Sequence, residues 1–127
     1  MEKIKVVHNP RCRKSRESLA FLEDKGLEFE TRLYLEDKLS NAELSEILKK
    51  LGVQAIDLMR KGESDFKEFI RGKELSEDEM IEQMVAHPKL IERPIVIRGS
   101  KAVVARPAEK IEELLWALAF VAQPFGH

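Results

Sequence analysis

Within the first 33 residues the spacing of the apolar residues changes twice, from strand-like to helical and back to strand-like. This pattern limits the possible folds more than any other feature of the sequence. Residues 3–8 are a β-branched run that stops at Asn9-Pro10, because proline lacks the N–H that a continuing strand would donate. From Arg13 the apolar and small residues follow a helical period up to Gly26, a typical helix stop. The residues that share the inward helix face are Ser15, Ser18, Leu19 and Leu22.

A second strand is predicted over residues 28–33. Phe29, Thr31 and Leu33 alternate with charged residues, which is the period of a strand with one face toward water. The two strands and the helix between them make a βαβ unit of about 30 residues.

A helical insert is predicted over about residues 40–88. Two capping boxes, Ser40 with Glu43 and Ser76 with Glu79, each precede apolar residues at helical spacing. The first helix buries Leu44, Ile47, Leu48 and Leu51, and the second runs through Met80, Ile81 and Met84 to His87-Pro88. Shorter helical turns are expected at residues 56–60 and 65–70.

The C-terminal part predicts a hairpin and a last helix. Residues 95–98 and 101–104 are apolar runs joined by Gly99-Ser100, a link suited to a tight antiparallel turn. Pro107 is expected at the first position of the last helix. Its inward residues are Ile111, Leu114, Leu115 and Leu118.

The order β-α-β, helical insert, β-β-α indicates the α/β class. A thioredoxin-like four-stranded mixed sheet covered by helices, with the insert between strand two and the C-terminal hairpin, is the simplest assembly. With 127 residues, 43% of them apolar, we expect one domain over residues 1–127.

Composition restricts the partners and the compartment. With a formal net charge of −1, the protein has no overall positive potential that would attract nucleic acid or an anionic membrane, so neither is expected as a partner. The most apolar stretch, residues 114–122, is too short to cross a bilayer, and the start of the chain does not resemble a secretory signal. A single cysteine makes no internal disulfide, so a cytoplasmic location is expected.

That single cysteine, Cys12, is the candidate nucleophile. It stands where the first helix begins, at the C-terminal end of the first strand, with four cationic residues within four positions: Arg11, Arg13, Lys14 and Arg16. The helix dipole and the cationic side chains both favour the thiolate, which is the reactive form. The alternative is a small buried hydrophobic residue, which is what most free cysteines are.

The neighbouring residues limit the chemistry further. Ser15 takes the place of the second cysteine in a Cys-x-x-Cys pair, so an adduct on Cys12 needs an external thiol for its release. A phosphatase-type loop would have arginine where Ser18 stands. No metal is expected, since the histidines His8, His87 and His127 are scattered, and glycine-rich nucleotide loops are absent.

The sequence resembles the glutaredoxin-dependent arsenate reductase family, a thioredoxin-fold group with a helical insert, from about Ile4 to Leu118. The motif His8-Asn9-Pro10-x-Cys12, followed by Ser15-Arg16, matches that family's catalytic loop. The resemblance implies that Arg60, Arg93 and Arg106 bind the oxyanion and lower the pKa of the cysteine. It also implies a cis peptide bond before Pro94. His8 either tunes Cys12 or is a hydrogen-bonded structural histidine, and the sequence leaves both open.

The function implied by the resemblance is reduction of arsenate or a similar oxyanion. Cys12 attacks the anion, glutathione serves as co-substrate with no bound cofactor, and glutaredoxin is the partner that clears the final mixed disulfide. Members of that family usually have small residues between the cysteine and the serine, whereas this chain has Arg13-Lys14. These larger basic residues are expected to alter access to the site or the choice of substrate. Two alternatives stay open: a non-catalytic or regulatory protein-binding module, and a monothiol oxidoreductase acting on glutathione mixed disulfides.

Overall fold

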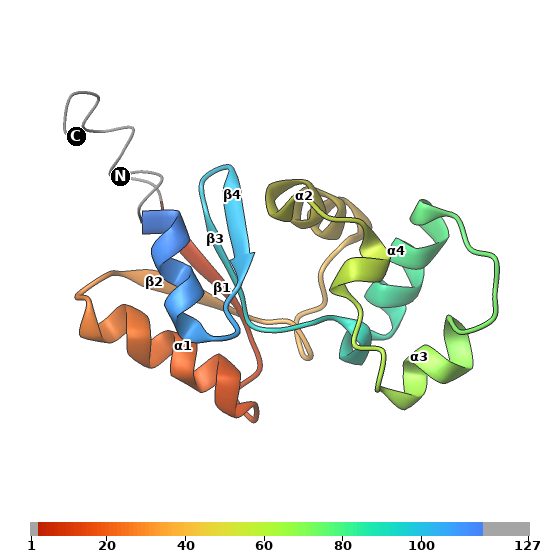
Figure 1. Cartoon of the computed structure of the whole chain (residues 1–127), viewed down its shortest axis with the longest axis horizontal. Helices are drawn as coiled ribbons and strands as arrows, with labels where there is room; N and C mark the ends of the chain where they lie inside the picture. Colours follow the sequence, from red (N-terminus) through yellow and green to blue (C-terminus); the bar gives the residue numbers. More distant parts are fainter. Residues whose placement is uncertain (1–2, 116–127) are drawn as a thin grey trace. The chain divides into compact units, whose positions relative to one another are not determined.

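The changes of hydrophobic period correspond to a series of short strands and helices (Figure 1). The structure, a computed structural model, describes residues 3–115. In chain order its elements are β1 (Ile4–His8), α1 (Arg13–Asp24), β2 (Phe29–Leu33), α2 (Asn41–Leu51), η1 (Ala55–Leu58), α3 (Ser64–Phe69), α4 (Glu77–Ala86), η2 (Pro88–Leu90), β3 (Ile95–Arg98), β4 (Lys101–Val104) and η3 (Ala108–Ile111).

These elements form two compact units. The sheet unit contains the described residues up to Arg32 and from Arg93 onward, and the helical unit contains Leu33–Glu92. The helical unit therefore extends beyond the predicted insert of residues 40–88 at both ends. The expectation of one domain over residues 1–127 stays a prediction.

The sheet unit has the predicted α/β architecture. Its four strands are ordered β2-β1-β3-β4 in a mixed sheet, with β3 antiparallel to both β1 and β4. Val6 pairs with Val96, and Ile97 pairs with Ala102 across the predicted hairpin. Gly99 has a φ of 60°, a left-handed conformation that glycine adopts without steric cost, and this explains its place in the turn.

One apolar cluster joins the sheet to its helices. Side chains from β1, α1, β3 and the C-terminal helical turns meet in it: Ile4, Val6, Leu22, Val96, Ala105, Ile111 and Leu114. The predicted inward face of α1 is confirmed, because Ser15, Ser18 and Leu22 are buried there. This cluster fixes the position of α1, and hence of its first residues, relative to β1.

The predicted inward face of β2 is wrong beyond Phe29. Phe29 packs against the apolar cluster, but Thr31 is exposed and Leu33 is 37% exposed. β2 is an edge strand, and the chain turns at Leu33, whose carbonyl accepts hydrogen bonds from the N–H groups of Glu36 at 3.0 Å and Asp37 at 2.8 Å. The turn leaves the Leu33 side chain outside the core.

Both capping boxes that the sequence predicts are present in the helical unit. Ser40 caps α2 and Ser76 caps α4, each in reciprocal hydrogen bonds with the glutamate three residues later. Leu44, Ile47 and Leu48 of α2 are buried, as are Ile81 and Met84 of α4. The two shorter turns begin one residue earlier than predicted, and the first of them, η1, is a 3-10 helix. No helix within residues 3–115 is long and apolar enough to span a membrane.

The last helix starts differently from the prediction. The Arg106-Pro107 peptide bond is cis, and Pro107 is the N-cap of η3 rather than the first residue of an α-helix. Helical structure continues through Leu115, with Ile111 and Leu114 buried as predicted and Leu115 half-buried. Leu118 lies outside the described residues.

Removal of the Leu22 side chain tests the role of the apolar cluster. Leu22 is fully buried, so Leu22→Ala should lower the free energy of unfolding by about 2–5 kcal/mol through lost burial and a cavity. Denaturant unfolding measures the change. Leu35→Ala, at a side chain that is 37% exposed, is the control and should cost less than about 1 kcal/mol. Equal losses in the two variants would contradict this account of the core.

Candidate active site

A tight turn leads from β1 into α1 and places Cys12. The carbonyl of Asn9 accepts the Cys12 N–H at 2.9 Å, and the Asn9 side-chain oxygen accepts the Arg11 N–H at 3.0 Å. The Asn9 N–H donates to the hydroxyl of buried Ser15 at 3.3 Å. Asn9 therefore holds both ends of the turn, and Ser15 ties the turn to the first turn of α1.

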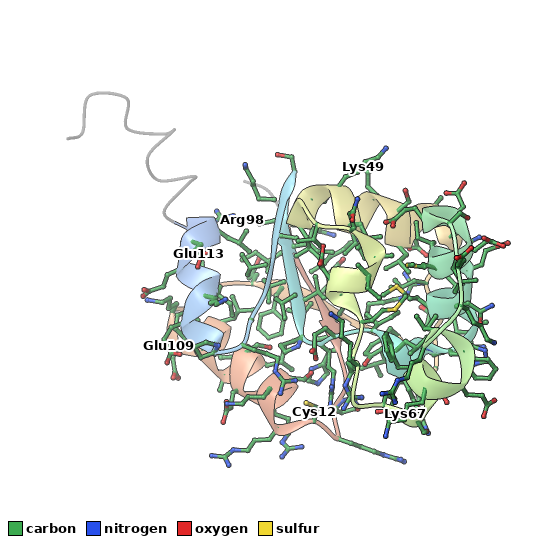
Figure 2. All side chains as sticks on the ribbon, turned by 45° about the vertical axis from the view of Figure 1, so that its right-hand side comes forward. Cys12, Lys49, Lys67, Arg98, Glu109 and Glu113 are labelled. Atoms are coloured by element: carbon green, nitrogen blue, oxygen red, sulfur yellow. The ribbon has the colours of Figure 1, made fainter. Side chains whose placement is uncertain are left out.

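Cys12 is the N-cap residue of α1 and is partly exposed (Figure 2). Its partial burial acts to raise the pKa of the thiol. This effect is outweighed by the backbone N–H groups of Ser15 and Lys14, the Ser15 hydroxyl and the positive charge of Arg93, so the pKa of Cys12 is lowered. The lowered pKa agrees with the thiolate predicted from the sequence.

The cation that lowers this pKa is not one of the neighbouring residues that the local sequence pattern favours; it is Arg93, one of the three arginines that the family resemblance implies. Arg13 is 83% exposed and bonds the Glu17 carboxylate at 3.0 Å, and Lys14 reaches the same carboxylate at 3.6 Å. Arg16 donates to the carbonyl of Pro10 at 3.0 Å. The effective guanidinium is that of Arg93, which tertiary folding brings to the thiol.

Arg93 and Arg106, two of the three predicted oxyanion ligands, lie together in the sheet unit. A guanidinium N–H of Arg106 donates to the carbonyl of Arg93 at 3.2 Å. Each arginine precedes a cis proline, and the cis bond predicted before Pro94 is confirmed. The Pro94 carbonyl accepts the Ala105 N–H at 2.9 Å, which links the two arginine-proline segments through their backbones.

Arg60, the third predicted ligand, belongs to the helical unit. Its N–H donates to the carbonyl of Leu90 at 2.7 Å, and its guanidinium reaches the carbonyl of Lys89 at 3.4 Å and the Glu63 carboxylate at 3.1 Å. These contacts anchor Arg60 within its own unit. A role for Arg60 at Cys12 stays a prediction.

His8 closes β1 and is 5% exposed. Burial, with a smaller contribution from the charge of Arg16, lowers the pKa of its imidazole and favours the neutral form. Its Nδ1 atom has no hydrogen-bond partner among the described residues. The two interpretations of His8, a residue that tunes Cys12 and a structural histidine, therefore both stay predictions.

The sequence pattern missed two features of the site. The hydrogen bond between Arg106 and Arg93 joins residues far apart in the chain, and the only signal for it is that each stands directly before a proline. The action of Arg93 on the thiol is implied only by the family resemblance, because Arg93 and Cys12 are distant in the sequence and no local pattern connects them. Among the described residues, no cluster of histidine, cysteine and carboxylate side chains has the arrangement of a metal site.

The sheet order, the thiol at the start of α1 and the cis proline define a protein of the thioredoxin-like fold with a single ionisable thiol. The sequence model of the ArsC family matches residues 7–114. The chain therefore belongs to the ArsC family.

Three similar proteins match this chain over nearly their whole length. YfgD, an uncharacterised protein of Escherichia coli, is 45% identical over 116 residues, which are 90% of this chain and 98% of YfgD. An arsenate reductase of Haemophilus influenzae is 43% identical, covering 87% of this chain and 97% of its own. The solved structure of an arsenate reductase from Vibrio cholerae has a TM-score of 0.84 and 40% identity, covering 88% of this chain and 97% of that one.

Substitution of Arg93 tests the origin of the lowered thiol pKa. Arg93→Ala removes the positive charge that favours the thiolate, so the pKa of Cys12 should rise. The pH dependence of alkylation of this single cysteine measures the shift. Arg13→Ala removes an equal charge next to Cys12 and should leave the pKa unchanged, because Arg13 faces Glu17 and solvent. A larger rise in the Arg13 variant would contradict the assignment.

Proposed function

We propose that this protein is a glutathione- and glutaredoxin-coupled reductase of arsenate or a similar oxyanion. The observation that carries the proposal is a partly exposed thiol whose pKa is lowered by the N-terminal N–H groups of α1 and by Arg93. Such a thiol is a nucleophile at neutral pH without a dedicated base. A family relative that bears the name arsenate reductase at 43% identity supports the choice of substrate class.

The oxyanion would bind through Arg93 and Arg106. Guanidinium groups form paired, directional hydrogen bonds with such oxygens, and their charge offsets that of the anion. The hydrogen bond from the Arg106 guanidinium to the Arg93 main-chain carbonyl holds the Arg106 side chain beside the Arg93 backbone. Arg60 would supply the third guanidinium, as the family motif implies.

The reaction then proceeds by attack of the Cys12 sulfur on arsenic. A sulfur–arsenic bond forms, and one arsenate oxygen leaves as water after protonation. Glutathione attacks the Cys12 sulfur of this adduct, so the sulfur–arsenic bond breaks and its electron pair stays on arsenic. Arsenic(V) becomes arsenic(III), arsenite is released, and the two thiols become a mixed disulfide between Cys12 and glutathione.

An external thiol must complete the cycle. Ser15 stands where a resolving cysteine would be, so Cys12 has no thiol of its own chain to displace glutathione. Glutaredoxin would remove the glutathionyl group and restore the Cys12 thiolate. This cycle needs no bound cofactor, and it fits the reducing cytoplasm, where glutathione is kept available.

A coupled assay with and without glutaredoxin tests the proposal. Wild-type protein should reduce arsenate with glutathione as electron donor, and glutaredoxin should raise turnover by removing the mixed disulfide. Cys12→Ser should lose turnover by at least about 10³-fold, because the serine hydroxyl is not ionised at neutral pH. Lys25→Ala, at the opposite end of α1 and paired with Glu112, is the control and should retain normal turnover.

Three results would contradict the proposal. Normal turnover by the serine variant removes Cys12 from the mechanism. Deglutathionylation of a peptide without any response to arsenate indicates a monothiol oxidoreductase. An inactive protein with the thiol pKa near the free-cysteine value of about 8.5 indicates a binding module.

A further inference from the structure

Three basic residues flank Cys12 in the chain, and the chemistry described above does not use their side chains. We call Arg11, Arg13 and Lys14 the basic rim. Arg11 is exposed, and its side chain forms no ion pair among residues 3–115. Arg13 and Lys14 share the single carboxylate of Glu17, at 3.0 and 3.6 Å, so the rim keeps an excess of positive charge.

The rim faces solvent rather than the sulfur. The side chain of Arg13 is 83% exposed and that of Lys14 is 44% exposed. The positive side chain that acts on the Cys12 thiol is Arg93, and Lys14 contributes through its backbone N–H. In Figure 2, Cys12 lies at the margin of the sheet unit, among side chains that end in nitrogen. The rim is therefore available to a molecule that approaches the sulfur from outside.

We propose that the basic rim binds the carboxylates of glutathione and guides its sulfur to Cys12. The inference rests on the proposed function, in which glutathione must reach this sulfur in every cycle. Glutathione carries two carboxylates and one ammonium group at neutral pH, so it is anionic overall and matches the charge of the rim. The exposed ion pairs with Glu17 are weak and exchange readily for a ligand carboxylate.

Exchange with disulfides of different charge tests the rim without arsenate. The Cys12 thiolate attacks one sulfur of oxidised glutathione, the old sulfur–sulfur bond breaks, a new one forms to Cys12, and one glutathione thiolate leaves. The same exchange occurs with neutral bis(2-hydroxyethyl) disulfide and with cationic cystamine. Because the chain has one cysteine, mass spectrometry follows each adduct without ambiguity.

The test variant is Arg13→Gln combined with Lys14→Gln. Each exposed cation contributes about 2- to 5-fold to a contact of this kind, so exchange with oxidised glutathione should slow about 4- to 25-fold when both are removed. Exchange with the neutral disulfide should stay within about 2-fold of wild type, and exchange with cystamine should become faster. The difference between variant and wild type should nearly vanish at about 1 M salt, where the screening length is about 3 Å.

A matched control removes the same charge elsewhere in the sheet unit. Lys3→Gln combined with Lys25→Gln acts at the start of β1 and the end of α1, away from Cys12, where the lysines pair with Glu30 and Glu112. This control should react like wild type with all three disulfides. The thiol pKa of each variant, measured in parallel, separates a change in contact from a change in thiolate fraction.

Two results would overturn the rim as a glutathione contact. One is an unchanged rate with oxidised glutathione, and the other is an equal loss with all three disulfides. These results are independent of arsenate reduction, so failure of the proposed function is recognised separately by absent turnover in the coupled assay. Where turnover is present, the test variant should raise the KM for glutathione and leave that for arsenate unchanged.

Discussion

The negative charge on the Cys12 sulfur is the feature on which the proposed chemistry of this protein depends. Partial burial acts to raise the pKa of the Cys12 thiol and so favours its protonated form. Two main sources oppose this effect, with a smaller contribution from the Ser15 hydroxyl: the backbone N–H groups of Ser15 and Lys14, which α1 leaves without helical partners, and the guanidinium of Arg93. Both sources are fixed by the fold, so the thiolate is stabilised before any substrate arrives.

The fold holds these two sources in place by separate means. The apolar cluster packs Leu22 of α1 against Ile4 and Val6 of β1, which sets where α1 begins. The β3-β4 hairpin brings the two arginine-proline segments together, and the hydrogen bond from Arg106 to the Arg93 carbonyl joins them. Cys12 and the two arginines proposed to bind the anion thus come from opposite ends of the sequence and lie in one unit.

Much of the fold could be predicted from the sequence because its signals are local. Capping boxes at Ser40 and Ser76, the Gly99 turn and the period of α1 all lie within a few residues of the structures they specify. The prediction of which β2 side chains are buried is wrong beyond Phe29, because their burial depends on the edge position of the strand and on the turn at Leu33. At the site, the local pattern attributes the ionisation of Cys12 to adjacent cations, and only the family resemblance includes Arg93, the arginine whose charge acts on the thiol in the structure.

The thiol pKa of the wild-type protein tests this account most directly. It is obtained from the pH dependence of the rate at which iodoacetamide alkylates the single cysteine, in native protein and in urea-unfolded protein. The account predicts a midpoint for the native protein below both the unfolded value and the free-cysteine value of about 8.5. A native midpoint equal to or above the unfolded one would show that the fold does not stabilise the thiolate, and would contradict the central claim.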